Sequence, residues 1–348
     1  MNRSDFDLSS YFLVLNTAEM KFLFLVAVLA MAVTLIKGYT DEEQWRDFKR
    51  KHQLNYNIPS DNGREDRKRK TLFLDSKKKL KEESKVQMSF FQQLNAFSVM
   101  RPVEKQRFLG VNASLVPSDR FMESIKDEFQ IKDSLPLSLD YRYDSCLTPV
   151  RNQGSCGSCW AFSAITPLEF SRCKNINAPV VLSEQQLVDC DTTNYGCNGG
   201  WYVTAWTYLQ QGSGSVKRTL YPYTARKGTC RSNNSAIEAR VNTFNYLATK
   251  NAPAMQVALQ RYGPLAVAMT VINSFYNYAG GVYNDPACDG KAVNHGVVIV
   301  GWGVLNGIDF WIVRNTWGHR WGLGGYAFIQ RGVNKCGIEE YPAYATAY

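Results

Sequence analysis

The fold of this chain is decided by the stretch Gln153-Gly154-Ser155-Cys156-Gly157-Ser158-Cys159-Trp160-Ala161-Phe162. It joins a glycine-rich turn to an apolar run that predicts a buried helix from Cys159 to Lys174. A helix N-terminus favours an anion, so this position would help Cys159 to form a thiolate. Three interpretations of the C-x-x-C spacing are open: a redox pair, half of a metal site, or one bridged cysteine beside a free nucleophile.

The cysteine count favours the third interpretation. A redox pair would directly follow a strand in a βαβ unit, and the glycine-rich turn does not offer that context. A structural zinc site would need a second pair of nearby ligands, and the chain has no second C-x-x-C. All nine cysteines lie between Cys146 and Cys336, which is typical of an oxidising compartment, and the odd count leaves at least one thiol unpaired.

A cysteine nucleophile requires a histidine that takes up and returns a proton. The cysteine-rich region contains two, His295 at the start of a strand-like apolar run and His319 in a polar loop. We expect His295 to be the partner of Cys159. Asn315, in Arg314-Asn315-Thr316-Trp317-Gly318, can accept a hydrogen bond from the second ring nitrogen, and Trp317 can shield that bond from water.

The order of the expected elements predicts an α+β protein. Helical patterns come first, at residues 65–83, 159–174 and 183–190, and Ser183 with Gln186 fits a helix-capping pair. Short apolar runs follow and predict strands at residues 265–269, 296–300, 310–313 and 326–329. Helices first and strands second indicate two subdomains with a cleft between them. The looser segment at about 110–134 predicts a linker.

Length, charge and the N-terminus narrow the class of protein. A chain of 348 residues allows two or three units. The net charge is +9, but the basic residues are dispersed except at 64–85, which predicts a solvated helix face rather than a nucleic-acid site. The apolar run Phe22–Ile36 with Ala30-Met31-Ala32 predicts a cleaved secretory signal. Because nineteen residues precede Met20, a start at Met20 and an uncleaved anchor stay open.

These segments resemble the papain family of cysteine proteases, in its cathepsin L-like branch. His295 and Asn315 follow Cys159 by 136 and 156 positions, close to the spacing in that family. The resemblance extends to Thr148-Pro149-Val150 and to residues 182–190, 196–200 and 321–326. It implies a papain-like two-subdomain fold, with a helical left domain, a β-barrel-like right domain and the catalytic cleft between them. It also implies a cysteine endopeptidase that acts through a Cys159 thiolate–His295 ion pair and a thioester acyl-enzyme.

The resemblance implies further site residues. Gln153 would donate to the developing oxyanion together with the backbone N–H of Cys159, and Gly199 and Gly200 would pair with an extended substrate. The other substrate-binding residues would be Trp201, Tyr202, Ala268, Gly296, Trp317 and Tyr341. We expect a preference for a medium aliphatic side chain two residues before the cut and poor acceptance of arginine. Cys230 follows Cys197 by 33 positions, too few for the blocking loop of cathepsin B-like exopeptidases, which favours endopeptidase activity.

The family pattern also implies three disulfides and leaves two cysteines over. The bridges would be Cys156–Cys197, Cys190–Cys230 and Cys288–Cys336, with Cys159 free. Cys146 and Cys173 form either a fourth bridge or two buried thiols. Asn112 and Asn233 begin glycosylation sequons. We expect no metal and no cofactor.

The front part resembles the family's inhibitory propeptide. The spaced helix motif is present as Glu65, Arg69, Phe73, Ser76 and Leu80, and Leu94-Asn95-Ala96-Phe97 matches the next motif. Val99 stands where that motif usually has aspartate, so the usual acid-sensitive trigger would lack its carboxylate. We therefore expect a signal region at 1–38, an inhibitory propeptide at 39–134 and a peptidase domain at 135–348, made as an inactive zymogen in the secretory pathway and acting in lysosomes or outside the cell.

The expected partners follow from this assignment. They are peptide and protein substrates, the chain's own propeptide and cystatin-type inhibitors, bound by a monomer without nucleic acid. A catalytically silent papain-like binding protein is the first alternative, but Cys159, His295 and Gln153 are all present. A transglutaminase-like acyl transferase is the second, but that class usually pairs histidine with aspartate and would not explain the propeptide-like front.

Overall fold

The computed structural model describes residues 39–116, 135–212, 214–232 and 236–348. The expected signal region, the later part of the expected linker and the sequon at Asn233 lie outside the described residues. The chain divides into two compact units, residues 1–63 and 64–348. None of the described helices is both long and apolar enough to cross a membrane.

The described part of the first unit is built on one capped helix, α2 (Asp41–His52). The Thr40 side chain accepts a hydrogen bond from the backbone N–H of Glu43, and the Glu43 carboxylate accepts one from the backbone of Thr40. This reciprocal capping box satisfies two N–H groups that would otherwise lack partners at the helix start. Trp45 stacks with Phe48, their ring centroids 5.9 Å apart.

In the second unit, the predicted helices at 65–83, 159–174 and 183–190 are confirmed as α3, α5 and α6. Ser183 caps α6 by accepting the N–H of Gln186. The helices are α3 (Arg64–Glu83), α4 (Pro102–Gln106), α5 (Cys159–Ile176), α6 (Glu184–Cys190), α7 (Tyr202–Gln211), α8 (Ala252–Tyr262) and α9 (Asn273–Tyr276). Short 3-10 turns are η2 (Pro59–Asp61) in the first unit, and η3 (Ala96–Val99), η4 (Ala113–Leu115), η6 (Tyr141–Tyr143), η7 (Gly196–Asn198), η9 (Pro286–Cys288) and η10 (Lys335–Gly337) in the second.

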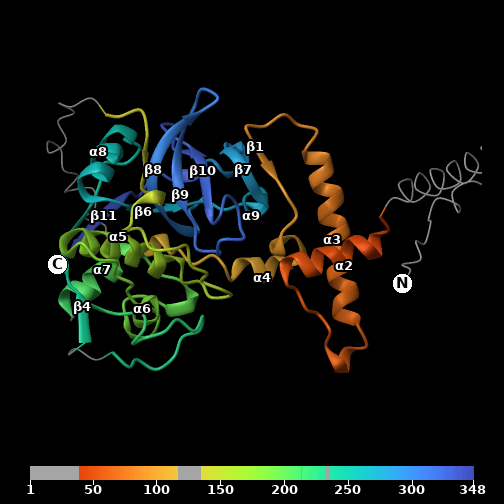
Figure 1. Ribbon diagram of the computed structural model, residues 1–348, viewed down its shortest axis with the longest axis horizontal. Coiled ribbons are helices and arrows are strands. Elements are labelled where there is room, and N and C mark those ends of the chain that lie inside the picture. The colour runs from red at the N-terminus through yellow and green to blue at the C-terminus, as the bar shows by residue number, and fades with distance from the viewer. Residues whose placement is uncertain (1–38, 117–134, 213, 233–235) are drawn as a thin grey trace, which may run out of the picture. The chain divides into compact units, whose positions relative to one another are not determined.

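The strands of the second unit form a nine-stranded sheet and a separate two-stranded pair. The order in the larger sheet is β1-β7-β10-β9-β8-β6-β11-β5, and β2 pairs with β8 (Figure 1). The strands are β1 (Phe90–Gln92), β2 (Leu139–Asp140), β3 (Ser215–Val216), β4 (Ile237–Ala239), β5 (Val241–Tyr246), β6 (Leu265–Met269), β7 (Tyr278–Tyr283), β8 (His295–Leu305), β9 (Ile308–Arg314), β10 (Tyr326–Gln330) and β11 (Ala343–Ala347). The four predicted strands are confirmed as β6, β8, β9 and β10.

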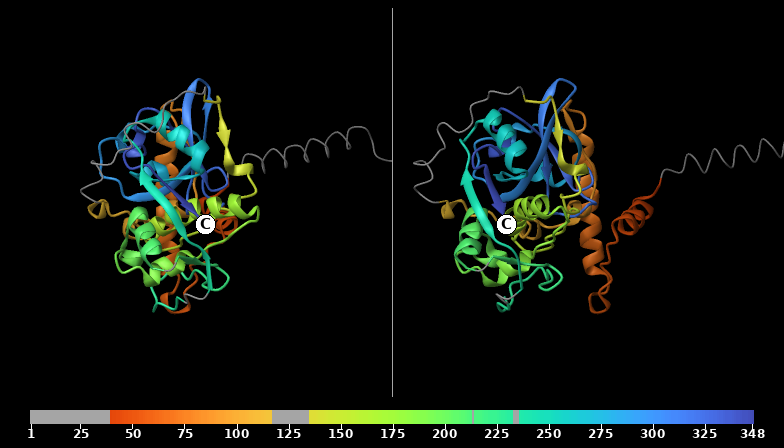
Figure 2. Two further views of the ribbon diagram at one scale, coloured as in Figure 1. Left: turned by 90° about the vertical axis from the view of Figure 1, so that its left-hand side faces the viewer. Right: turned by 60° about the vertical axis from the view of Figure 1, so that its left-hand side comes forward.

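Two apolar cores divide residues 135–348 into a helical half and a strand half. Trp160 and Trp206 are fully buried in the first core, around α5 and α7, whereas Trp302 and Trp311 are fully buried in the second, among the strands. Helix α5 contacts β8 and β11, so it lies where the halves meet. Figures 1 and 2 show the green helices and the blue strands as neighbouring layers. The predicted α+β, papain-like two-subdomain fold is confirmed.

The segment before residue 116 is joined to the strand half through the sheet itself. Strand β1 pairs antiparallel with β7, with Phe90 opposite Gly281, and the backbone N–H of Val282 donates to the carbonyl of Ser89 over 2.8 Å. Phe97 extends this attachment, because it belongs to the apolar core of the strand half. Residues 64–116 therefore fold as part of the same unit as the region that follows them.

Candidate active site

Cys159 is the first residue of α5, with Ser158 as its N-cap. It is fully buried and is the one cysteine without a disulfide. The helix starts here because a glycine-rich turn ends against a run of apolar side chains that fill the helical core. The predicted position of Cys159 at a helix N-terminus is thus confirmed.

His295 begins β8, and Asn315 directly follows β9, the strand paired with it. The His295 Nε2 and Asn315 Oδ1 atoms are 2.7 Å apart, so the amide oxygen accepts from Nε2–H and leaves Nδ1 without a proton in the neutral ring. Nδ1 is buried and has no hydrogen-bond partner among the described residues. The Trp317 ring lies 4.8 Å from the imidazole, centroid to centroid. His319, the other candidate, is exposed in its loop.

The start of β8 lies against the first turn of α5 because residue 296 is glycine. A Cβ atom on Gly296 would lie 3.3 Å from the carbonyl oxygen of Cys159 and 2.9 Å from the Ser163 hydroxyl. The backbone N–H of Gly296 hydrogen-bonds toward the Cys159 thiol. Since His295 is the preceding residue, its backbone lies next to this contact with the first turn of α5.

Gln153 is fully buried, and all of its polar atoms have partners. Its backbone N–H donates to the Thr316 carbonyl over 2.8 Å, and its side-chain oxygen accepts from the Thr316 hydroxyl. Its side-chain Nε2 donates to the carbonyl of Cys156 over 2.8 Å and to that of Phe108 over 3.1 Å. The Gln153 amide therefore lies against the turn that leads to Cys159 and already holds a carbonyl oxygen from the front part of the chain.

Residues 108–112 lie across this group of side chains. The carbonyl of Gly110 accepts the Gly200 N–H over 2.9 Å, and the Asn112 N–H donates to the Gly200 carbonyl over 3.1 Å. This makes a parallel bridge centred on Val111 and Gly200. The Gly110 N–H also donates to the Asn294 carbonyl over 3.1 Å. The prediction of a linker from about residue 110 is wrong for residues 110–112, because their backbone groups are paired with the region that follows residue 135.

Burial under this segment changes the protonation of the two candidate catalytic groups. It raises the pKa of the Cys159 thiol to about 11, although the N–H groups of Gly296 and Gly110 act in the opposite direction. It lowers the pKa of His295 to about 4, against the hydrogen bond that the ring donates to the Asn315 side-chain oxygen. Loss of water penalises both charged forms. Both shifts therefore disfavour the expected thiolate–imidazolium pair while the segment covers the site.

The expected substrate-binding residues gather beside the covering segment. Gly200 pairs with it, Gly199 precedes this contact, and Ala268 faces Gly296 across β6 and β8. Trp201 and Tyr202 are fully buried, and the ring of Trp201 meets that of Tyr341 edge-on at 5.3 Å. Val111, Val293 and Tyr341 pack against the same apolar cluster. Of these, Val111 and Val293 were not predicted, since neither belongs to a motif that marks a site.

Four disulfides are present. The structure pairs Cys156 with Cys197, Cys190 with Cys230, and Cys288 with Cys336, as the family pattern implies, and it also pairs Cys146 with Cys173. The two alternatives left for the last pair are thereby resolved as a fourth bridge. A group of potential metal ligands is formed by Cys288, Asp289 and Cys336, but its cysteines are bridged and its carboxylate pairs with Lys335, so it offers no thiolate.

A half-buried ion pair joins α3 to the segment that leads to Phe108. Arg69 of α3 binds both carboxylate oxygens of Glu104, at 2.6 and 2.7 Å, and donates to the Val99 carbonyl over 2.7 Å. The Arg69 guanidinium holds the pKa of Glu104 well below its usual range. Glu104 was not predicted. The same guanidinium binds the Glu104 carboxylate and the backbone carbonyl of Val99.

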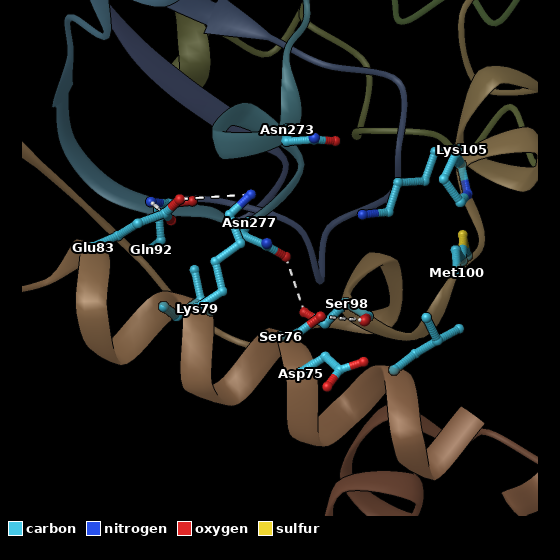
Figure 3. Close-up of a pocket in the computed structure, with 13 residues that line it drawn as sticks. Asp75, Ser76, Lys79, Glu83, Gln92, Ser98, Met100, Lys105, Asn273 and Asn277 are labelled. Atoms are coloured by element: carbon cyan, nitrogen blue, oxygen red, sulfur yellow. Dashed lines mark hydrogen bonds and ion pairs between the residues drawn. The ribbon is translucent and has the colours of Figure 1, made fainter. Parts of the chain in front are cut away.

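A pocket of about 190 Å³ lies between α3 and the loop that carries Asn277, and Figure 3 shows residues that line it. On its wall, the Ser76 hydroxyl donates to the Ser98 carbonyl over 2.6 Å, and the Ser98 hydroxyl donates to Asn277 Oδ1 over 2.9 Å. These bonds join the front helix to the strand half. Ser76 stands where the family motif usually has asparagine, and its hydroxyl makes the hydrogen bond to the Ser98 carbonyl.

Comparison with known proteins agrees with this geometry. Residues 135–346 match the profile of the papain family cysteine proteases. The chain is 32% identical over 327 residues to a cathepsin L-like proteinase of Phaedon cochleariae, covering 92% of this chain and 98% of that one. It is 42% identical over 212 residues to mouse cathepsin K, covering 60% of this chain and 64%, under two thirds, of that one. The solved digestive procathepsin L2 of Tenebrio molitor superposes with a TM-score of 0.81 at 32% identity, covering 88% of this chain and 100% of that one.

The chain belongs to the papain family of cysteine proteases. Solved structures similar to it include precursors, such as the recombinant stem bromelain precursor, with a TM-score of 0.76 at 29% identity, covering 88% of this chain and 98% of that one. Its function is that of a cysteine endopeptidase made as a zymogen, and in the described residues the front segment covers the site.

Proposed function

We propose that Cys159 is the nucleophile of peptide hydrolysis and that His295 is its proton partner. One observation carries this: a free cysteine starts α5, against the strand whose first residue is a histidine already fixed by Asn315. With the propeptide gone, water returns to both groups and the helix N-terminus favours the sulfur anion. The pair then becomes thiolate and imidazolium.

The reaction proceeds in two halves. The Cys159 thiolate attacks the scissile carbonyl carbon, and the negative charge moves to the carbonyl oxygen. The Gln153 amide and the Cys159 backbone N–H donate to this oxygen, each contributing on the order of 3 kcal/mol. The His295 imidazolium gives its proton to the leaving amine, and a thioester remains. Neutral His295 then takes a proton from water, whose oxygen attacks the thioester and releases the carboxylic acid and Cys159.

Substrate binding uses the backbone that now pairs with the propeptide. We infer that Gly199 and Gly200 pair with an extended peptide, and that the pocket is lined by Trp201, Tyr202, Ala268, Gly296, Trp317 and Tyr341. The packing of Val111 against the cluster that contains Trp201 and Tyr202 supports an aliphatic preference two residues before the cut. A peptide library in which arginine exceeds leucine at that position would contradict it.

Maturation removes the front part. We propose a signal region at 1–38, a propeptide at 39–134 and a peptidase domain at 135–348. Four disulfides support synthesis in the secretory pathway and action in lysosomes or outside the cell. Asn112 and Asn233 would carry glycans. The mature monomer would bind peptide substrates and cystatin-type inhibitors.

The test uses a thiol-directed epoxide and a peptide substrate. The full-length precursor should resist labelling, and the processed enzyme should be labelled at Cys159 and lose activity in proportion. Cys159→Ala should abolish both, while Cys288→Ser, which removes a bridged cysteine, should leave the label at Cys159. Labelling of Cys159 without hydrolysis of any library peptide would instead favour the catalytically silent binding protein.

A further inference from the structure

Tyr223 lies in the loop that follows β3, beside the start of α5. Its side chain is half-buried, and its ring meets Phe162 edge-on, with centroids 5.0 Å apart and an interplanar angle of 82°. Phe162 is three residues after Cys159 on α5. The ring contact therefore fixes the Tyr223 side chain against the helix that carries the nucleophile.

The Tyr223 hydroxyl joins two residues of the glycine-rich turn. It donates to the backbone carbonyl of Gln153 over 2.7 Å, and its oxygen lies 2.6 Å from the Ser158 hydroxyl. A carbonyl can only accept, so the tyrosine proton goes to Gln153 and the Ser158 hydroxyl donates to Tyr223. Burial raises the pKa of Tyr223 above its ordinary value, so the donor keeps its proton at any pH at which the site works.

Of these two residues, Gln153 carries one proposed oxyanion donor and Ser158 is the neighbour of the other. Gln153 supplies the side-chain amide, and Ser158 directly precedes Cys159, whose backbone N–H is the other donor. Thr316 holds the backbone N–H and the side-chain oxygen of Gln153, which leaves the Gln153 carbonyl to Tyr223. The Tyr223 hydroxyl thus links Gln153 at the start of the turn to Ser158 at its end.

We propose that Tyr223 is a positioning residue that sets the separation of the two oxyanion donors. This rests on the function proposed above for Gln153 and Cys159. Pre-set donors matter because they stabilise charge only where it develops in the transition state. A loosened turn would therefore lower kcat and leave ground-state binding, and so KM, nearly unchanged.

The test compares Tyr223→Phe with Tyr221→Phe. Both changes remove one hydroxyl and keep the ring, but the Tyr221 hydroxyl donates to Asp189, away from the turn. Each precursor is processed to the mature enzyme, and active sites are counted by epoxide titration so that misfolded molecules do not enter kcat. Tyr223→Phe should lower kcat per titrated site about tenfold with KM within about twofold, less than the 10²–10³-fold typical for loss of a whole donor. Tyr221→Phe should leave kcat per site unchanged.

A double substitution separates positioning from general support of the fold. In a Gln153→Ala background, Tyr223→Phe should lower kcat by less than about threefold, because the group it positions is gone. A full tenfold loss in that background, or wild-type kcat in Tyr223→Phe alone, would overturn the proposal. If Tyr223→Phe gives no titratable sites, Ser158→Ala is used instead, because it removes the hydrogen bond between the Ser158 and Tyr223 hydroxyls. It should lower kcat at unchanged KM, and unchanged kcat there would overturn the proposal as well.

The two proposals fail in distinguishable ways. An enzyme whose wild-type Cys159 takes no label and cleaves no peptide would contradict the proposed function. A wild-type enzyme that is labelled and active, with Tyr223→Phe equal to it, would leave that function intact and remove only the role of Tyr223.

Discussion

The carbonyl oxygen of Phe108 accepts a hydrogen bond from the side-chain amide of Gln153, with 3.1 Å between the heavy atoms. The precursor's own backbone thus occupies a donor that we assign to the oxyanion of the reaction. Inhibition here is competition for that donor as well as exclusion of substrate.

Gly110→Ala should open the covered site. A Cβ atom on Gly110 would lie 1.9 Å from the Gly157 carbonyl oxygen, which is backbone and cannot move aside, so the segment at 108–112 would lift. We expect the rate of Cys159 labelling in the full-length precursor at neutral pH to rise at least about tenfold, because lifting the segment restores access. Gln106→Ala, an exposed change in α4, is the control. Equal labelling of Gly110→Ala and wild type would contradict the close packing.

Removal of the propeptide should lower the pKa of the nucleophile. In the covered site burial holds the pKa of Cys159 at about 11 and that of His295 at about 4. We expect the pH profile of alkylation by a small thiol reagent to show a high-pH rise in the precursor and a plateau from acid to neutral pH in the mature enzyme. Superimposable profiles would mean that the covering segment does not control protonation.

The Arg69–Glu104 pair should set the pH at which the propeptide leaves. Arg69 lowers the pKa of Glu104 in the docked state, with Glu65 and Arg101 also facing the pair. Because both residues belong to the front segment, the lowered pKa stabilises the folded form of that segment above the ordinary carboxylate pKa, and this stabilisation is lost progressively as the pH falls from the ordinary value to the lowered one. The hold of the front segment therefore weakens as the pH falls below about 4.5, the ordinary value.

Glu104→Gln tests that dependence. It should raise the midpoint pH of Cys159 labelling in the precursor by at least about one unit, since the guanidinium then loses its two-oxygen carboxylate partner and keeps only the pairing with Glu65. Glu82→Gln removes an exposed carboxylate that pairs with Lys85 and should leave the midpoint in place. A midpoint for Glu104→Gln equal to that of wild type would show that another group controls release.

The Cys146–Cys173 bridge should stabilise the peptidase domain. It spans 27 positions, and closing a loop of that size in the unfolded chain contributes about 3 kcal/mol. The double change Cys146→Ser and Cys173→Ser should lower the free energy of unfolding by about that amount, measured in denaturant, with kcat per titrated site unchanged. Peptide mapping without reduction should recover the two cysteines in one linked fragment.

Local sequence patterns were enough to predict the helix and the strand that carry the candidate catalytic residues. Apolar runs of suitable length predict the helix that begins at Cys159 and the strand that begins near His295. A thiolate needs a histidine and a group that orients it, and the sequence offers few candidates besides His295 and Asn315. These inferences use short stretches of sequence whose structure depends mainly on their own residues.

The covering segment was missed for a physical reason. Phe108 and Gly110 act through contacts with Gln153, Gly157 and Gly200, far along the chain, and a short stretch before a sequon has no periodicity that shows this return. Glu104 was missed because Glu65, four residues before Arg69 on the same helix, already offers that arginine a carboxylate. The partner of Cys146 could not be deduced from spacing alone.

Strand β1 has one further consequence for the life of this protein. While it is attached, it pairs with the open side of β7. Cleavage removes β1 and leaves unpaired peptide groups along Tyr278–Tyr283, so that β7 becomes an edge strand. An exposed edge strand can pair with another extended chain and start aggregation. The segment discarded at maturation would thus also have protected the newly made enzyme from association with its own copies.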